Sequence, residues 1–150
     1  MKTIKEIDFK GKKALVRVDF NVPMSDEMII SDDSRIKAAI PTITKIVNDG
    51  GSVILMSHRG RPKGAVNEAL SLVHLVQHIS DLLNMPVQFV DDCIGEKAEE
   101  TASNLKDGEV LLLENLRFYN EETSGDIEFA KSLSKLGDIY VNDAFGTAHR

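Results

Sequence analysis

The sequence predicts an α/β fold, a three-layer α/β/α, Rossmann-like arrangement built on a parallel sheet. Five short apolar runs are rich in β-branched residues and have the length of strands buried on both faces. They begin near residues 13, 52, 87, 110 and 139. The intervals are long enough for strand–helix–strand crossovers, which need about a dozen connecting residues or more. Several intervals carry apolar residues at helical spacing, so helices on both faces of the sheet are expected.

The individual elements follow from the same patterns. The expected strands cover residues 13–20, 52–56, 87–90, 110–113 and 138–141. Apolar residues at helical spacing predict helices over 36–47, 72–83 and 129–136. Asp32 or Asp33 is a candidate N-cap for the first helix, and Pro41 must either kink that helix or begin it anew. The polar stretch 120–126 is interpreted as a surface loop.

Composition favours a soluble protein of the cytoplasm. The 150 residues carry a formal net charge of −6, which disfavours nucleic acid or an anionic membrane as the main partner. A single cysteine, Cys93, excludes an intramolecular disulfide. The apolar runs are too short to span a membrane, and charges occupy the place where a signal peptide has its apolar stretch.

The arginines gather where a parallel sheet binds ligands. Arg17 lies near the end of the first expected strand. Each of the others lies in a loop or turn that follows a strand: Arg35, Arg59, Arg61, Arg117 and Arg150. Ligands bind at the carboxyl ends of parallel strands, and arginine suits two-pronged contact with carboxylate or phosphate. We therefore expect a small anionic ligand at this edge. The alternative is a set of ordinary surface salt bridges.

Polar side chains accompany these arginines. Asp19 and Asn21 follow the first strand, and His58 and Gly60 lie among the arginines after the second. Carboxylate and amide groups can hold a ligand hydroxyl, while arginine and histidine hold its anionic groups. For Asp19 and Asn21, a local turn is the alternative interpretation.

Several other chemistries are not indicated. The sequence has no glycine-rich phosphate loop and no nucleophile-elbow motif. His74 and His78 have metal-ligand spacing but no metalloprotease motif around them, and they are interpreted as helix surface. No metal site is expected. Acidic neighbours make Cys93 a poor nucleophile. Glu121 and Glu122 are interpreted as solvated charge.

Five segments together resemble the N-terminal lobe of the phosphoglycerate kinase family, in that family's order and over nearly the whole chain. They are Val16-Arg-Val-Asp-Phe-Asn-Val-Pro23, Asp33-Ser-Arg-Ile36 with Pro41-Thr-Ile43, Ser57-His58 through Gly64, Leu111 through Phe118 with Glu121-Glu122, and Val141 through Arg150. The family has two α/β lobes. The resemblance implies that the N-terminal lobe binds 3-phosphoglycerate or 1,3-bisphosphoglycerate and that the C-terminal lobe binds MgADP or MgATP. It also implies that hinge closure between the lobes brings the two substrates together for transfer.

The resemblance also implies roles for individual residues. Asp19 and Asn21 would orient the glycerate, with Phe20 between them. The non-transferred phosphate would be held by His58, Arg61, Arg117 and Arg150. Arg35, the expected catalytic residue, would face the reacting carboxyl group and stabilise the phosphoryl group in transfer. The backbone of Arg59 and Gly60 would line the site, although the family more often has leucine in place of Arg59. Arg17 lies beside the site.

The expected activity is reversible phosphoryl transfer between 1,3-bisphosphoglycerate and ADP in glycolysis, by a monomer. Residues 1–150 are expected to form the substrate lobe, incomplete at its C-terminal end and without the nucleotide-binding lobe. Alone, the chain is expected to bind no nucleotide and to be inactive. Two alternatives remain. One is a stand-alone, non-catalytic module that binds phosphorylated glycerate or another anion, and the other is a generic α/β domain with a structural or partner-binding role.

Overall fold

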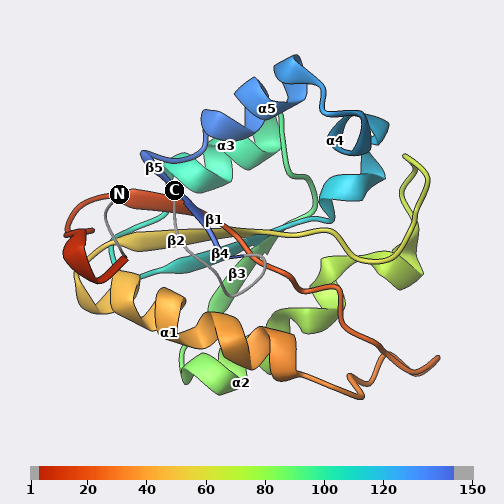
Figure 1. The fold of residues 1–150 in the computed structure, drawn as a ribbon, viewed down its shortest axis with the longest axis horizontal. Helices are drawn as coiled ribbons and strands as arrows, with labels where there is room; N and C mark the ends of the chain where they lie inside the picture. Colours follow the sequence, from red (N-terminus) through yellow and green to blue (C-terminus); the bar gives the residue numbers. More distant parts are fainter. Residues whose placement is uncertain (1–3, 144–150) are drawn as a thin grey trace.

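Five parallel strands form one sheet in the order β3-β4-β2-β1-β5 in the computed structural model, which describes residues 4–143 (Figure 1). The strands are β1 (Lys13–Arg17), β2 (Ser52–Met56), β3 (Val87–Val90), β4 (Val110–Leu113) and β5 (Ile139–Asn142). Every neighbouring pair is parallel. The predicted parallel sheet is therefore confirmed, and three of the five strands have the predicted boundaries.

Helices cover both faces of the sheet, which confirms the three-layer α/β/α prediction (Figure 1). They are α1 (Ser34–Asn48), α2 (Val76–Leu83), α3 (Glu96–Ser103), α4 (Asn120–Ser124) and α5 (Ile127–Ser134). Four 3-10 helices join them: η1 (Ile4–Glu6), η2 (Glu68–Leu70), η3 (Leu72–Leu75) and η4 (Leu116–Phe118). Helices α1 and α2 lie on one face, and α3 and α5 lie on the other.

The core consists of two clusters separated by the sheet. Val53 and Leu55 of β2 pack toward α1 and α2. Ile54 and Met56 pack toward α3 and α5. All five residues of β2 are buried because side chains alternate between two covered faces. This explains the continuous apolar runs in the sequence.

Several predicted boundaries were wrong. Strand β1 ends at Arg17, three residues before the predicted end, because the Phe20 N–H leaves the ladder and donates to Ser57 Oγ at 2.9 Å. Strand β5 begins and ends one residue later than predicted. The predicted helix 72–83 is split into η3 and α2. Helix α1 runs through Pro41 as one helix and does not restart there.

The N-terminus of α1 lacks the side-chain hydrogen bond that an N-cap residue usually makes. Asp33 occupies the N-cap position, but its side chain makes no cap hydrogen bond. Asp32 Oδ1 instead accepts the Ser34 N–H at 2.9 Å. Asp33 Oδ2 lies 2.8 Å from His78 Nε2, which links the start of α1 to α2.

The order of the strands creates a topological switch point at the carboxyl ends of β2 and β4. The connections after β1 and β2 lead to helices on the α1 and α2 face, whereas those after β3 and β4 lead to the opposite face. Strands β2 and β4 are neighbours, so the loops at their carboxyl ends diverge. Such a switch point is the usual ligand position in an open α/β sheet. No helix in the described part of the chain is long and apolar enough to cross a membrane.

Candidate anion-binding site

The structure brings most of the predicted arginines to the carboxyl edge of the sheet. Arg17 ends β1, and Arg59 and Arg61 lie in the loop after β2. Two placements correct the prediction that all the others lie in loops. Arg35 is in the first turn of α1, and Arg117 is in η4. The remaining predicted arginine, Arg150, lies outside the described residues.

Asp19, Asn21 and Arg35 form one hydrogen-bonded group. Arg35 Nη1 donates to Asn21 O at 2.8 Å and lies 3.3 Å from Asp19 Oδ1. Asp19 Oδ1 also accepts the Asn21 N–H at 3.1 Å, as the local-turn interpretation requires. The Asn21 side chain reaches beyond that turn, because its Oδ1 accepts the Gly60 N–H at 2.9 Å. The turn therefore also fixes the loop after β2. Phe20, between the two polar residues, is fully buried in the core.

The two arginines of the β2 loop have different environments. The Arg59 side chain is buried and donates to Ala69 O at 2.8 Å and to Val22 O at 3.4 Å. It holds the surrounding loops together, so the Arg59 side chain, unlike the prediction for the arginines as a group, is not available to a ligand. Arg61 is exposed and makes no hydrogen bond or ion pair within residues 4–143. Its guanidinium group is available to a ligand.

Gly60, between these arginines, occupies a position that other residues fit poorly. Its φ of +65° lies in the left-handed region. A Cβ atom there would lie 2.6 Å from the Leu70 side chain. The close approach of Leu70 explains why glycine separates the two arginines.

Asn115 connects the loops after β2 and β4. It is fully buried, and its Oδ1 accepts the backbone N–H groups of Arg59 at 3.2 Å and Arg117 at 3.0 Å. Its Nδ2 donates to Arg59 O at 2.7 Å and to Leu70 O at 3.0 Å. All four hydrogen-bonding positions of the amide are therefore used. Asn115 is not among the predicted site residues, and its position two residues beyond a buried strand is the one sequence signal that points to it.

Charged groups surround His58 on the same edge. Burial lowers the pKa of His58, and the nearby Arg117 and Arg17 lower it further. Burial alone would raise the pKa of Glu122, but Arg17 and Arg117 outweigh that effect and hold the pKa below its ordinary value. Glu122 therefore carries its charge at neutral pH. Its side chain is only 13% exposed, so its interpretation as solvated charge was wrong.

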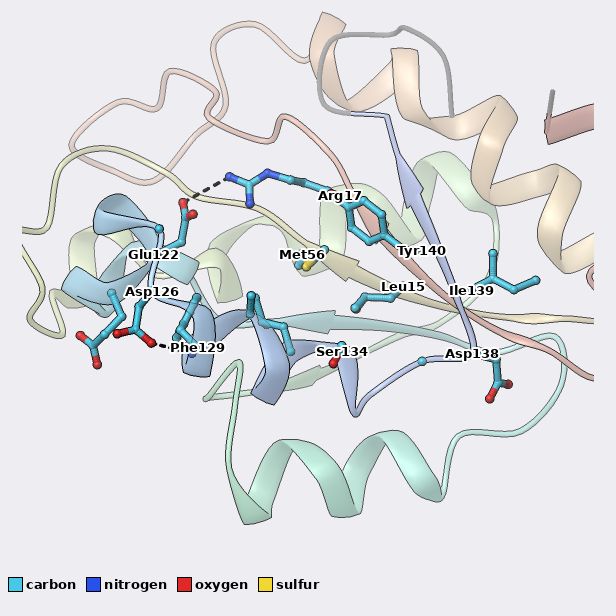
Figure 2. Close-up of a pocket in the computed structure, with 15 residues that line it drawn as sticks. Leu15, Arg17, Met56, Glu122, Asp126, Phe129, Ser134, Asp138, Ile139 and Tyr140 are labelled. Atoms are coloured by element: carbon cyan, nitrogen blue, oxygen red, sulfur yellow. Dashed lines mark hydrogen bonds and ion pairs between the residues drawn. The ribbon is translucent and has the colours of Figure 1, made fainter. Parts of the chain in front are cut away.

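A cavity of about 500 Å³ lies beside this charged group, between α5 and the sheet. Figure 2 shows Leu15 and Met56 on the sheet side, Phe129 on α5, and the Arg17–Glu122 ion pair nearby. Of the predicted arginines that the structure describes, Arg17 alone lines the cavity. The candidate anion site is therefore the edge of the sheet where the other described arginines lie, and not this mainly apolar space.

The other residues considered from the sequence have structural environments. His74 Nε2 lies 2.9 Å from Glu68 O, and His78 contacts Asp33, so each ring faces its own partner. Burial raises the pKa of the Cys93 thiol, and Asp92 raises it further. Among residues 4–143, no group of three or more histidine, cysteine, aspartate or glutamate side chains could hold a metal ion.

Comparison with known proteins identifies the relatives of this chain. The model of the family described as "Phosphoglycerate kinase" matches residues 4–150. This chain belongs to the phosphoglycerate kinase family. The phosphoglycerate kinase of Chlorobium phaeovibrioides is 56% identical over 149 residues, which are 99% of this chain and 38% of that protein. The phosphoglycerate kinase of Borrelia hermsii is 54% identical over 150 residues, all of this chain and 38% of that protein.

Solved phosphoglycerate kinase structures have the same fold. The crystal structure of the enzyme from Pyrococcus horikoshii matches with a TM-score of 0.85 and 36% identity, over 97% of this chain and 37% of that one. The Coxiella burnetii structure matches with a TM-score of 0.81 and 34% identity, over 97% of this chain and 35% of that one. The chain thus spans about 38% of the length of curated phosphoglycerate kinases. The stand-alone binding module is not favoured.

Proposed function

We propose that this chain is the phosphoglycerate-binding part of a phosphoglycerate kinase, which transfers a phosphoryl group reversibly between 1,3-bisphosphoglycerate and ADP. One observation carries the proposal. Arg35 is bonded to the Asp19–Asn21 turn, and that turn is bonded through Gly60 to the loop that bears His58 and Arg61. Groups suited to a hydroxyl and groups suited to a phosphate are therefore joined on one sheet edge.

The two ends of the ligand would meet different parts of this edge. Asp19 and Asn21 would hold the glycerate part, and His58, Arg61 and Arg117 would hold the non-transferred phosphate. Arg150 is proposed for the same phosphate from its family motif. Arg35 is 52% exposed and would remain accessible to the reacting carboxyl group.

The chemistry of the reaction explains why arginines suffice. The acceptor, 3-phosphoglycerate, attacks through a carboxylate that is already ionised at neutral pH, so no general base is required. Catalysis then depends on positioning and on neutralising charge that is spread over the transferred group. An arginine in such a place contributes roughly three to five decades of rate in GTPases.

The nucleotide is assigned to the part of the family that lies outside the matched length. MgADP or MgATP would be a substrate held there, and the residues described here offer no set of ligands for its metal. The proposal further includes a monomeric, cytoplasmic enzyme, and predicts that residues 1–150 alone bind phosphoglycerate without transferring phosphate.

Calorimetric titration of the 150-residue chain with 3-phosphoglycerate tests the proposal. We expect a dissociation constant in the millimolar range or tighter, and weaker binding of inorganic phosphate and of glycerate, which each supply one half of the ligand. Equal affinity for phosphate and 3-phosphoglycerate would contradict the proposed substrate. Substantial ATP-dependent turnover by the 150 residues in a coupled assay would contradict the assignment of the nucleotide to a separate part.

A further inference from the structure

The carboxylate of Glu122 makes contact with two arginines through a single oxygen. Oε1 lies 3.2 Å from Arg17 Nη2 and 3.3 Å from Arg117 Nε. Arg17 ends β1, Glu122 belongs to α4, and Arg117 belongs to η4. The contact therefore joins two segments that β2 separates in the sheet. Figure 2 shows the Glu122 carboxylate directed toward the end of the Arg17 side chain.

Two cations in this place need a counter-charge. The side chains of Arg17 and Arg117 are 25% and 33% exposed, so water screens their mutual repulsion only partly. Both arginines also act on His58, whose pKa they lower. Glu122 supplies one negative charge between them and leaves the group with a net positive charge. The arginines can thus remain close together without a bound anion.

The contact leaves most arginine donors available. Each guanidinium group has five N–H donors, and Glu122 engages one nitrogen of each. Within residues 4–143, neither side chain makes another hydrogen bond. Both terminal nitrogens of Arg117 remain available for a two-pronged contact with phosphate. Glu122 therefore orients Arg117 through its Nε side and does not occupy its terminal pair of nitrogens.

We propose that Glu122 is a positioning residue, whose carboxylate holds Arg17 and Arg117 together as one unit for binding the phosphate group of the ligand. This inference rests on the proposed function. It adds Arg17 to the phosphate-binding machinery and explains why an acidic residue lies among its cations. A carboxylate that merely competed with the ligand would have the opposite effect, since its removal would strengthen anion binding.

The test compares Glu122→Gln with Glu121→Gln in the full 150-residue chain. Both substitutions remove one negative charge from α4, but the exposed Glu121 side chain makes no hydrogen bond or ion pair within the described residues. Glu122→Gln should weaken binding of 3-phosphoglycerate about tenfold, because the loss of a charge-assisted hydrogen bond leaves Arg117 unoriented. Glu121→Gln should change it less than about twofold. Glu122→Asp should restore part of the affinity.

A spectroscopic measurement separates positioning from general stability. In Glu122→Gln, the Arg117 Nε–Hε resonance should shift and lose its protection from solvent exchange. Urea unfolding of Glu122→Gln and Glu121→Gln, compared in parallel, measures any general loss of stability.

Unchanged or tighter binding of 3-phosphoglycerate by Glu122→Gln would overturn the inference while leaving the proposed function intact. If the unmodified chain bound inorganic phosphate as tightly as 3-phosphoglycerate, yet lost both with Glu122→Gln, the proposed substrate would fail and the positioning role would stand. Binding of neither anion by the unmodified chain would overturn both.

Discussion

Asn21 Oδ1 accepts the backbone N–H of Gly60 at 2.9 Å, and this bond ties the loop after β1 to the loop after β2. The bond links the turn that contacts Arg35 with the loop that carries His58 and Arg61. The geometry of one half of the candidate site therefore depends on the other half. Gly60 adopts a left-handed φ of +65° at the donor end of this bond.

Gly60→Ala should both destabilise the fold and weaken phosphoglycerate binding. The new Cβ would lie 2.6 Å from the Leu70 side chain and would require a strained backbone, at a cost of about 1–3 kcal/mol. Urea unfolding and calorimetric titration measure the two effects. Gly108→Ala is the matched control, since Gly108 also has a positive φ of 83° but nothing within 4 Å of the new Cβ. Equal losses of stability in both variants would show that Leu70 is not the obstacle.

Arg59→Leu and Arg61→Leu should have opposite signatures. The buried Arg59 side chain donates to two backbone carbonyl oxygens, so its replacement should lower the free energy of unfolding by about 1–3 kcal/mol. The affinity for phosphoglycerate should stay within about threefold of that of the unmodified chain. Arg61 is exposed, and its replacement should weaken binding while stability changes by less than about 0.5 kcal/mol. Denaturant unfolding and calorimetry applied to both variants check this. A loss of affinity confined to Arg59→Leu would reverse the assignment.

Asn115→Asp should be strongly destabilising despite its near-identical shape. The amide nitrogen donates to two carbonyl oxygens, and a carboxylate oxygen there would face both without a proton to share. Burial makes the expected cost about 3 kcal/mol. Urea unfolding measures it, with Asn104→Asp as the control on an exposed residue at the end of α3. A change no larger than the control's would mean that Asn115 does not hold the two loops together.

His58 should make stability fall as the solution becomes acidic. Burial, and then Arg117 and Arg17, lower its pKa in the folded chain below the ordinary value of 6.5. As the pH falls, His58 therefore takes up its proton at a higher pH in the unfolded chain than in the folded chain. The contribution of neutral His58 to the free energy of unfolding is complete above pH 6.5 and is lost as the pH falls toward the folded pKa. Urea unfolding at about pH 7.5 and about pH 5.5 should show a larger loss for the unmodified chain than for His58→Gln. By NMR titration, Arg117→Ala should raise the His58 pKa; a fall would show that Arg117 does not act on the ring.

Arg35→Ala should separate binding from catalysis. The Arg35 side chain is 52% exposed and its ion pair with Asp19 is screened by water, so the affinity of the 150-residue chain for 3-phosphoglycerate should change by less than about threefold. Under the proposed function, turnover is expected only in a longer protein, for example a chimera in which this chain replaces the matching 149 residues of the Chlorobium phaeovibrioides enzyme. There, Arg35→Ala should lower kcat by roughly three decades or more. A large rise in KM with unchanged kcat would assign Arg35 to ground-state binding instead.

The sequence was most informative where local pattern and burial agree. Strands β2, β3 and β4 have the predicted limits because each is a short apolar run between polar turns. Helix α3 escaped prediction because it buries only Ala98 and Ala102, which leaves too little apolar periodicity to detect. Helix α4 is five residues long and polar, so its sequence resembles a loop.

The candidate site was predictable as a set of residues at one edge, but not as a set of contacts. The strand pattern alone places Arg17 and Arg117 at the carboxyl edge. That Glu122 joins them depends on a contact between residues 105 positions apart in the chain, which no local pattern encodes. The buried role of Arg59 likewise depends on carbonyls of Val22 and Ala69 that the fold brings to it.

The central position of β2 has a consequence for how the two ends of the site move. Its backbone pairs with β1 on one side and β4 on the other, and all its side chains are buried. Such a strand opens last and exchanges its amide protons slowest. His58 lies two residues beyond its end, so the proposed phosphate end of the site follows directly on a strand that is paired on both sides and fully buried. Arg35 projects from the exposed start of α1, outside this strand pairing. Under the proposed function, we expect its side chain to move more readily, as contact with a group in transfer between two substrates would require.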